Sequence, residues 1–354
     1  MATVRVNRED FLQVLESVQA GISPRELLEQ SGCFVFKDKH VYTYNDEVAC
    51  KAPTGFDPKF VGAIHSKSVL ELLRKLPDGE LDITPAKSEW LITGKRKESR
   101  IRCDEKILLP IDNVDKTAEW QPLHSDFADA IAIVQECAGT DQSRHTLTCI
   151  HITPKWVEAC DNFQMARYRL KTGVTSKILV RRDSIKSIIS LGMTEFCETE
   201  SWIHFRNKRK LVLSCRRYLD EYDDLTPYLD VQGKPVSLPK GLEEAADRAE
   251  IFSADNVDTN AVLVEIRPEK LKITGQGVNG SHTEYKKIAK YDGKPLKFLI
   301  SPVLLRELVK KHNEAEVTHN RLKIEGPRWR YVTVLGKVND KADNENDGEE
   351  TTEE

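Results

Sequence analysis

Three stretches of the chain share one alternation of apolar and polar residues. In each, a short, mostly apolar run leads directly into a segment whose apolar side chains recur every three or four positions. The first pattern predicts a strand and the second an amphipathic helix with one core-facing stripe. These strand–helix pairs span 61–76, 176–191 and 296–311. Their helices begin at 66, 182 and 301, which are 116 and 119 residues apart, so the pattern indicates a threefold repeat.

Each strand–helix pair is flanked by further predicted elements. An amphipathic stretch lies upstream, at 7–21, 123–139 and 239–254, with Asn7 and Ser125 placed to cap the first two helices. Period-2 patterns predict strands at 34–44, 147–152 and 262–274, and closing strands at 81–103, 202–213 and 321–334. Each third therefore predicts an α+β domain with two helices packed on an antiparallel sheet.

The chain of 354 residues is long enough for two or three domains, and the repeat favours three. We expect domains at 1–118, 119–234 and 235–338, with linkers near 116–121 and 230–239. Residues 339–354 are acidic and nearly free of apolar groups, which predicts a disordered tail.

The second helix of each third combines an apolar stripe with exposed basic residues. The predicted stripes are Val69, Leu70, Leu72, Leu73 and Leu76; Ile185, Ile188 and Ile189; and Leu304, Leu305, Leu308 and Val309. Basic side chains at one repeated position favour contact with a phosphate backbone, although each face alone is also typical of a solvated helix. The candidate DNA-binding residues are Arg25, Lys67, Arg74, Lys75, Arg181, Arg182, Lys186, Arg306, Lys310 and Lys311.

Other features argue against such contact or leave it open. The first helices are acidic on balance, and the whole chain carries a net charge of −4, so any attraction to DNA has to be local. Basic runs at 95–97 and 206–210 lie at predicted turns, where they either touch DNA or keep the turns soluble.

The composition argues against disulfides, metal sites and membrane segments. The eight cysteines include no CxxC pair and lie mostly in apolar contexts, which predicts buried, reduced thiols. The nine histidines lack metal-ligand spacing, and we expect no metal, no cofactor and no catalytic residues. No signal-like segment and no apolar run of about 18 residues is present, so we expect a soluble, cytoplasmic protein without a membrane partner.

Three short segments, together with the repeat, resemble a known family. They are Lys-Ser-Val-Leu-Glu-Leu-Leu-Arg-Lys-Leu-Pro at 67–77, Ala-Cys-Asp-Asn-Phe-Gln-Met-Ala at 159–166 and Asp-Arg-Ala-Glu-Ile-Phe-Ser at 247–253. In their order and spacing, residues 4–338 are similar to the bacterial-type DNA sliding clamp, the β subunit of DNA polymerase III. The likeness is that of a divergent member.

The resemblance implies a head-to-tail homodimer that closes a ring around double-stranded DNA without reading its sequence. Carried over by position, the dimer interface would pair Ile101 and Cys103 with Ile251 and Phe252 of the second copy. The alternative is that these are core residues of their own domains.

The resemblance also implies a pocket that captures Leu/Phe-rich peptides from the replicative DNA polymerase and the clamp loader. Its wall would be Leu147, Cys160, Asn162, Phe163, Gln164, Met165, Pro227, Tyr228, Val332 and Val334. The segment 162–165 and the segment 334–338 differ from the family's usual residues, so the peptide preference is expected to differ as well.

The function predicted from these features is that of a non-catalytic processivity factor that tethers a polymerase to DNA. Two alternatives remain. One is a non-replicative interaction scaffold that keeps the clamp fold without the ring. The other is a metal-dependent nucleic-acid enzyme, in which Asp223 and Asp224 would hold Mg²⁺, although they lie in a Tyr-rich turn without a third acid.

Overall fold

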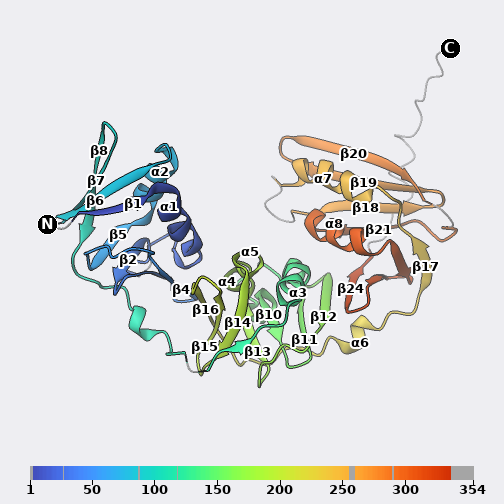
Figure 1. Ribbon diagram of the computed structural model, residues 1–354. Coiled ribbons are helices and arrows are strands. Elements are labelled where there is room, and N and C mark those ends of the chain that lie inside the picture. Colours follow the sequence, from blue (N-terminus) through green and yellow to red (C-terminus); the bar gives the residue numbers. More distant parts are fainter. Residues whose placement is uncertain are drawn as a thin grey trace, which may run out of the picture. The chain divides into compact units, whose positions relative to one another are not determined.

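The computed structural model describes residues 3–26, 28–86, 88–117, 119–254, 260–288 and 291–335. The predicted tail at 339–354 lies outside this part of the chain, as does the side chain of Lys311. The chain divides into two compact units. Their helices and strands are labelled in Figure 1. Unit 1 comprises residues 1–132, 148–156 and 170–221, and unit 2 comprises 133–147, 157–169 and 222–354. This division runs through the predicted middle domain, and the three-domain boundaries stay a prediction.

Unit 1 is built on an antiparallel twelve-stranded sheet in the order β1-β6-β7-β8-β5-β2-β3-β4-β16-β15-β14-β9. The strands are β1 (Val4–Asn7), β2 (Cys33–Lys37), β3 (His40–Tyr44), β4 (Val48–Pro53), β5 (Gly62–His65), β6 (Glu80–Ala86), β7 (Glu89–Gly94), β8 (Lys97–Asp104), β9 (Gln121–Pro122), β14 (Met193–Glu198), β15 (Trp202–Asn207) and β16 (Val212–Arg216). β10 (Cys149–Ile152) and β13 (Ile178–Arg181) form a further antiparallel pair in this unit.

The helices of unit 1 follow the predicted repeat. They are α1 (Arg8–Ser17), α2 (Ser66–Lys75), α4 (Arg182–Ile185) and α5 (Ile188–Leu191), with short 3-10 turns η1 (Gln19–Gly21) and η2 (Ile111–Asn113). Asn7 caps α1 as predicted, because its side-chain oxygen accepts the backbone N–H groups of Glu9 and Asp10. Gly21 lies against Thr43 of β3 so closely that no side chain fits there.

Two aromatic clusters form much of the core of unit 1. Trp90 packs with Phe11, Phe36 and Phe60, at ring-centroid distances between 4.8 and 6.4 Å. Elsewhere in the unit, Trp202 packs with Tyr44 at 6.1 Å. Phe11 comes from α1 and the half-buried Phe60 from the segment before β5, whereas the other rings come from predicted strands. Burial of such large side chains contributes much of the hydrophobic stabilisation of a core.

The chain passes between the units at five points. Three of them lie inside α3 (Phe127–Val134), η4 (His145–Thr148) and β11 (Trp156–Cys160), and the other two follow Arg169 and Glu221. The 3-10 turn η3 (Gln135–Cys137) follows α3. Ser125 was predicted to cap the helix that became α3, but that prediction is wrong, because the helix begins at Phe127 and Asp126 precedes it. Ser125 instead donates its hydroxyl to Asp126 Oδ1 at 3.0 Å.

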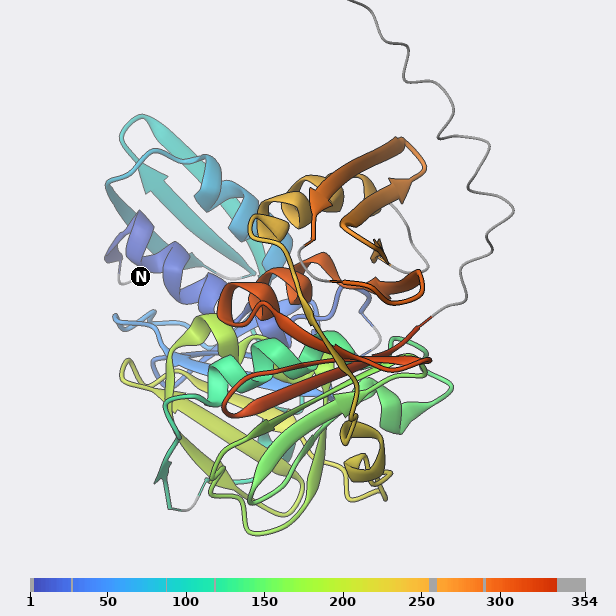
Figure 2. The ribbon, with the colours of Figure 1, turned by 90° about the vertical axis from the view of Figure 1, so that its right-hand side faces the viewer.

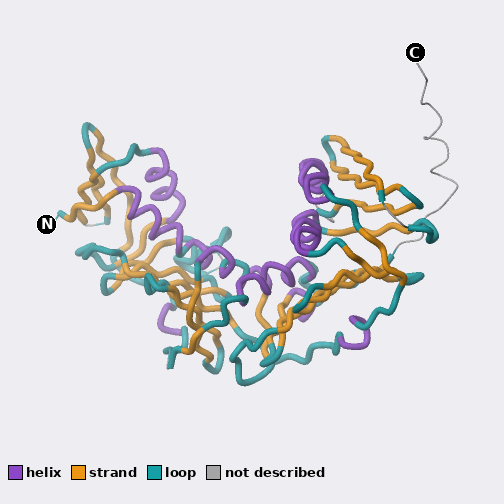
Figure 3. The backbone as a smooth tube through the Cα atoms, turned by 45° about the vertical axis from the view of Figure 1, so that its right-hand side comes forward, coloured by secondary structure: helices purple, strands orange, loops and turns teal. Residues whose placement is uncertain are grey.

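Unit 2 contains a four-stranded sheet in the order β20-β19-β18-β21, with β18 (Val262–Arg267), β19 (Lys270–Gly277), β20 (Gly280–Lys287) and β21 (Leu296–Ile300). α7 (Leu242–Ser253) and α8 (Pro302–Lys311) lie side by side against this sheet (Figure 3). Gly275 of β19 lies so close to the backbone of Ala249 that a Cβ there would overlap α7. This close contact seats the helix on the sheet.

The second sheet of unit 2 runs β12-β24-β23-β22-β17, and Figure 2 shows β23 and β24 alongside β12. Its strands are β12 (Gln164–Arg169), β17 (Lys234–Ser237), β22 (Glu314–Val317), β23 (Arg321–Glu325) and β24 (Trp329–Val334). Several elements of unit 2 lie outside those predicted from the sequence, namely β12, β17, β20, β22 and α6. The single turn α6 (Thr226–Leu229) follows an acidic segment and has Pro227 in its first turn, and β17 lies within the predicted linker at 230–239, where it pairs with β22.

Candidate nucleic-acid and peptide interfaces

The basic face of α2 is exposed, as the sequence predicts. Val69, Leu70 and Leu73 are buried, whereas Leu72 and Leu76 are half-buried. Lys67, Arg74 and Lys75 lie on the opposite, exposed face. Arg74 Nη2 lies 2.9 Å from Glu16 Oε1 on α1, so its charge is partly balanced within the unit. Among the described residues, none pairs with Lys67 or Lys75, which leaves both ammonium groups available to a polyanion.

The second predicted helix of the repeat, at 182–191, is broken into the single turns α4 and α5. The amides of Ile189 and Ser190 bind the carbonyls three residues back, and the Ser190 hydroxyl donates to the Ser187 carbonyl. Serine hydroxyls that compete for backbone carbonyls weaken an α-helix, which accounts for the tightened turns. Ile185 and Ile188 are buried as predicted, but Ile189 is exposed, so its predicted place in the core stripe is wrong.

The basic residues near this broken helix are only partly available. Arg181 Nη1 lies 3.9 Å from Glu47 Oε1, and Lys186 Nζ lies 2.9 Å from Asp183 Oδ1. Arg182 is half-buried. Arg25, in the loop before β2, is exposed, and its carbonyl accepts the Ser23 hydroxyl.

α8 differs from the prediction at its central arginine. Leu304, Leu305 and Leu308 are buried and Val309 is half-buried, which agrees with the predicted stripe. Arg306, however, is only 19% exposed and forms ion pairs with Asp247 and Glu250 of α7.

Although burial disfavours the charge of Arg306, the neighbouring carboxylates of Glu250 and Asp247 raise the pKa of its guanidinium. The prediction of an exposed Arg306 is therefore wrong, because the acidic face of the preceding helix neutralises it. Lys310 remains exposed, with its Nζ 3.8 Å from Glu307 Oε1.

The predicted peptide pocket falls within unit 2, around the antiparallel pair β12 and β24. Gln164 lies opposite Thr333 in the register, and Met165 lies opposite Val332. A cluster of buried apolar side chains lies here, with Met165 and Tyr222 packed against it: Leu147, Cys160, Leu225, Leu229, Val231 and Val332. Four predicted pocket residues (Leu147, Cys160, Met165 and Val332) thus belong to one apolar cluster.

Other predicted pocket residues form an exposed rim. Phe163 is 67% exposed, and Tyr228 and Val334 are about half exposed. Pro227 is exposed on α6, and Asn162 accepts a hydrogen bond from Arg144. The backbone N–H of Val334 donates to the Phe163 carbonyl at 2.9 Å, which joins the two strands beside the rim. A buried apolar base with exposed aromatic groups is the usual form of a site that anchors apolar peptide side chains.

Gln164 has a structural part in this region. Its Nε2 donates to the Glu136 carbonyl at 3.0 Å, and its Oε1 accepts the Tyr331 hydroxyl at 3.1 Å. Both side-chain atoms are therefore engaged inside unit 2, and we expect Gln164 to hold the end of β12 in place.

Tyr222 is a contributor that the sequence did not reveal. Its hydroxyl accepts the Cys160 N–H at 2.9 Å and donates to Cys160 Sγ at 3.3 Å. Burial raises the pKa of this phenol well above its usual value, so the group stays neutral. The contact fixes the segment before α6 against β11. The Tyr-rich turn, the alternative metal site, thus packs against the apolar cluster through Tyr222.

The paired acids of that turn have a local role. Asp224 Oδ1 accepts the Thr226 N–H at 2.9 Å, as a residue preceding a helical turn does. Within the described residues, no group of three or more His, Cys, Asp or Glu side chains is placed to hold a metal ion. Each of the eight cysteines is buried and forms no disulfide, as the sequence predicts.

The four predicted dimer-interface residues fall into two classes. Ile101 and Cys103 on β8 are buried in unit 1, so their side chains are core residues of their own unit and not accessible surface. Ile251 on α7 is 68% exposed. Phe252 stacks on His282 of β20, with the ring centroids 6.1 Å apart and the planes at 11°. Only the unit 2 residues therefore present apolar surface.

Each unit also has a strand edge with unpaired backbone groups. β8 pairs with β7 along its length but with β5 only through Asp104 and Cys103. β20 pairs with β19, and no second partner of β20 is found in the described part of the chain. Unpaired strand edges present backbone donors and acceptors that can pair with another chain.

Paired helices seated on antiparallel sheets, repeated along the chain, define the sliding-clamp fold of DNA polymerase III β subunits. Among solved structures, the chain is similar to the DNA polymerase III β chain of Streptococcus pneumoniae, with 15% identity, a TM-score of 0.71 and coverage of 96% of this chain and 100% of that one. It is similar to the DnaN sliding clamp of Pseudomonas aeruginosa bound to griselimycin, with 14% identity, a TM-score of 0.70 and coverage of 95% and 99%.

The β subunit from the DNA polymerase of Streptococcus pyogenes gives 16% identity, a TM-score of 0.69 and coverage of 95% and 100%. Neither a scan against protein-family models nor a search of the curated proteins finds a match. No described helix is both long enough and apolar enough to span a membrane. The α+β sliding-clamp fold that the resemblance implies is thus confirmed, at a sequence identity that shows the fold alone.

Proposed function

We propose that this protein is a DNA polymerase processivity factor, a divergent sliding clamp that encircles duplex DNA as a homodimeric ring. It catalyses no reaction and requires no cofactor. Its partners are double-stranded DNA, a second copy of itself, a replicative DNA polymerase and a clamp loader, and it acts in the cytoplasm. The observation that carries the proposal is the sliding-clamp fold, which extends over 95–96% of the chain and the whole of the solved clamps.

The proposed DNA contact is electrostatic and independent of base sequence. It uses the exposed ammonium groups of Lys67 and Lys75, with weaker contributions from Arg74 and Lys186, whose charges are shared with nearby acids. Few unpaired basic groups on a protein of net charge −4 give a weak attraction to phosphates. A weak attraction suits a clamp, because DNA held too tightly would not slide.

The proposed partner contact is the apolar cluster around β12, β24 and α6. Buried Leu229 and Val332 form its base, and the exposed ring of Phe163 stands at its rim. Such a site accepts one or two apolar side chains of a short peptide and gains most of its affinity from burying them.

The proposed dimer contact joins the β8 edge of one copy to the α7 and β20 side of another. Ile251 supplies exposed apolar surface, and the strand edges supply backbone hydrogen-bonding groups. Ile101 and Cys103 would then support β8 from within and not touch the partner. A closed two-fold ring repeats this contact twice.

Retention on circular DNA tests the function. Dilute protein is mixed with nicked circular plasmid and concentrated, so that rings close around the DNA, and the complex is washed in about 0.5 M NaCl to remove electrostatic binding. We expect protein to remain on the circle and to leave when one restriction enzyme linearises it. Equal loss from circular and linear DNA in the wash would overturn the proposal.

A second candidate is the non-replicative scaffold with a clamp fold. The ion pairs of Arg306 with Asp247 and Glu250 favour it, because an arginine neutralised in this way contributes little to DNA binding. A scaffold of this kind would bind partner peptides normally and would show no retention on circular DNA.

A further inference from the structure

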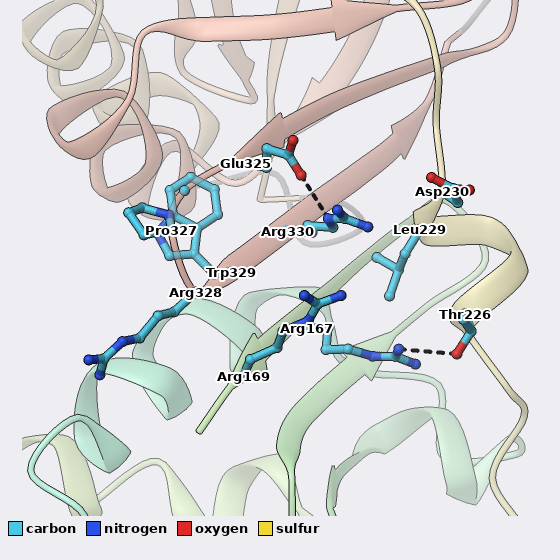
Figure 4. Close-up of a pocket in the computed structure, with 11 residues that line it drawn as sticks. Arg167, Arg169, Thr226, Leu229, Asp230, Glu325, Pro327, Arg328, Trp329 and Arg330 are labelled. Atoms are coloured by element: carbon cyan, nitrogen blue, oxygen red, sulfur yellow. Dashed lines mark hydrogen bonds and ion pairs between the residues drawn. The ribbon is translucent and has the colours of Figure 1, made fainter. Parts of the chain in front are cut away.

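A cavity of about 470 Å³ lies in unit 2 between the end of β12 and the start of β24 (Figure 4). The two strands are antiparallel, with Arg167 opposite Arg330 and Tyr168 opposite Trp329. Residues of α6, among them Leu229, form another wall. Leu229 also belongs to the apolar cluster described above, but the polar walls distinguish this cavity from that site.

Positive charge is concentrated in this cavity. Its lining contains four arginines, Arg167, Arg169, Arg328 and Arg330, and two acids, Asp230 and Glu325. Like charges placed directly opposite across a strand pair are destabilising unless they are compensated.

Two of the arginines are compensated by neighbouring carboxylates. Arg167 Nε lies 2.6 Å from the buried Glu158 Oε2, and Arg330 Nε lies 2.7 Å from Glu325 Oε2. These ion pairs hold both guanidinium groups in the wall (Figure 4 shows the pair of Arg330 with Glu325).

The other two arginines stand at the mouth. Arg169 and Arg328 are exposed, and their backbones are joined by a hydrogen bond from the Arg169 N–H to the Arg328 carbonyl at 2.7 Å. Within the described residues, no side chain pairs with the guanidinium of Arg169. Guanidinium groups match carboxylates in shape and bind them through two parallel hydrogen bonds, so this mouth suits a carboxylate-rich peptide.

The chain itself supplies such a peptide. Residues 336–354 contain eight acidic side chains against two lysines. The segment begins directly after Leu335, close to the end of β24, whose first residues line the cavity. β24 covers about 17 Å between these points. A segment of 19 residues reaches up to about 60 Å, so it can return to the cavity.

We propose that the acidic tail at 339–354 docks in cis into this arginine-lined cavity. The tether holds the tail at an effective concentration of the order of millimolar, so a few carboxylate–arginine contacts are enough to keep it docked. Almost no apolar side chain is available in the tail, so it cannot fill the neighbouring apolar cluster, and the cavity is its electrostatic match. This inference does not depend on the proposed function, because docking is measured directly on the tail.

The test uses the full chain with a fluorophore on the tail. Thr352→Cys supplies the single reactive thiol, since the eight native cysteines are buried. The anisotropy of a dye at this position is high when the tail is docked and low when it is free. We expect high anisotropy in about 50 mM NaCl, a fall in about 500 mM NaCl, and no change with protein concentration.

Two variants and a matched control decide the outcome. Arg169→Glu with Arg328→Glu, and separately Glu349→Gln with Glu350→Gln, Glu353→Gln and Glu354→Gln, should each lower the docked-to-free ratio by about tenfold or more. Lys95→Glu with Arg96→Glu makes the same charge change as the arginine pair, at an exposed turn of unit 1, and should leave the anisotropy high.

The proposal is overturned by any of three results. The anisotropy of the arginine double variant equals that of the unaltered chain, the control lowers it as much as the arginine variant does, or docking increases with protein concentration, which would mean that the tail binds another molecule.

Discussion

The guanidinium Nη1 of Arg306 on α8 lies 2.5 Å from Asp247 Oδ1 on α7. The same atom also pairs with Glu250 one turn further along α7. An arginine whose position in the repeat indicated a phosphate contact therefore joins the two helices of its own unit. Replacing it is expected to affect folding more than DNA binding.

Arg306→Gln should lower the free energy of unfolding by about 1 kcal/mol, because Asp247 and Glu250 then face each other without a cation. Urea denaturation followed by circular dichroism measures this change. Lys310→Gln is the matched control, since its 3.8 Å pair with Glu307 is exposed, and we expect a change within about 0.5 kcal/mol. Unchanged stability of the Arg306 variant together with a large loss of DNA affinity would contradict this account of the residue.

The α2 lysines are expected to carry much of the DNA contact. Lys67→Glu with Lys75→Glu should weaken binding to a duplex by roughly tenfold at low salt and reduce the slope of log K against log [NaCl] by about 2. Anisotropy of a labelled duplex at several NaCl concentrations gives both quantities. Lys171→Glu with Lys177→Glu places the same charges at exposed sites of unit 1 outside the predicted contact. An equal loss in both variants would mean that net charge alone matters.

Phe163 is expected to contribute to peptide binding without contributing to stability. Phe163→Ala should weaken the binding of a fluorescein-labelled peptide containing two leucines and a phenylalanine by about tenfold, the loss usual for an aromatic anchor. The midpoint of thermal unfolding should be the same for this variant as for the unaltered chain, because the Phe163 ring is largely exposed. Val278→Ala, at an apolar site of unit 2 that is more exposed than Phe163 (88% against 67%), is the control. Equal peptide affinity of both variants would exclude Phe163 from the site.

Stability should depend on pH through His204, a buried residue of β15. Burial lowers the pKa of this imidazole from 6.5 to about 4, so the folded state keeps it neutral. Between those values the unfolded chain binds one proton more, and the free energy of unfolding falls as the pH falls, by up to about 3 kcal/mol in total.

His204→Gln should remove this part of the pH dependence, whereas the exposed His319→Gln should retain it. Urea denaturation at pH 7, 6, 5 and 4.5 provides the comparison. A curve of the same steepness in the His204 variant would show that other groups produce the effect.

The strand–helix repeat was predictable because its signals are local. The apolar stripes of α2 and α8 and the Asn7 cap depend on neighbouring residues in one helix, and the structure confirms them. The failure at Arg306 depends on a contact between two elements distant in sequence. Arg306 would be exposed on an isolated helix, and most of its side chain is covered once α7 lies beside it.

The candidate peptide site was also only partly predictable from the sequence. Apolar residues such as Met165 and Val332 were assigned from the resemblance, and the structure brings them together. Tyr222 and Leu225 were missed because they lie in an acidic segment with no periodic pattern. Their place in the cluster follows from the hydrogen bonds of Tyr222 to Cys160, 62 residues away in the chain. Ile189 was predicted to be buried because the apolar periodicity assumes one continuous helix over 182–191. The structure breaks this helix into α4 and α5, and Ile189 is exposed.

Molecular mass in solution tests the central claim, that two copies of this chain close a ring. Sedimentation equilibrium at micromolar concentration should give a dimer of about 81 kDa, twice the chain mass of 40.3 kDa. Ile251→Asp should give the monomer because it places a charge in the proposed interface, and Leu219→Asp, at a residue equally exposed at 68%, should leave the dimer intact. A mass near 40 kDa for the unaltered chain at every concentration would contradict the ring.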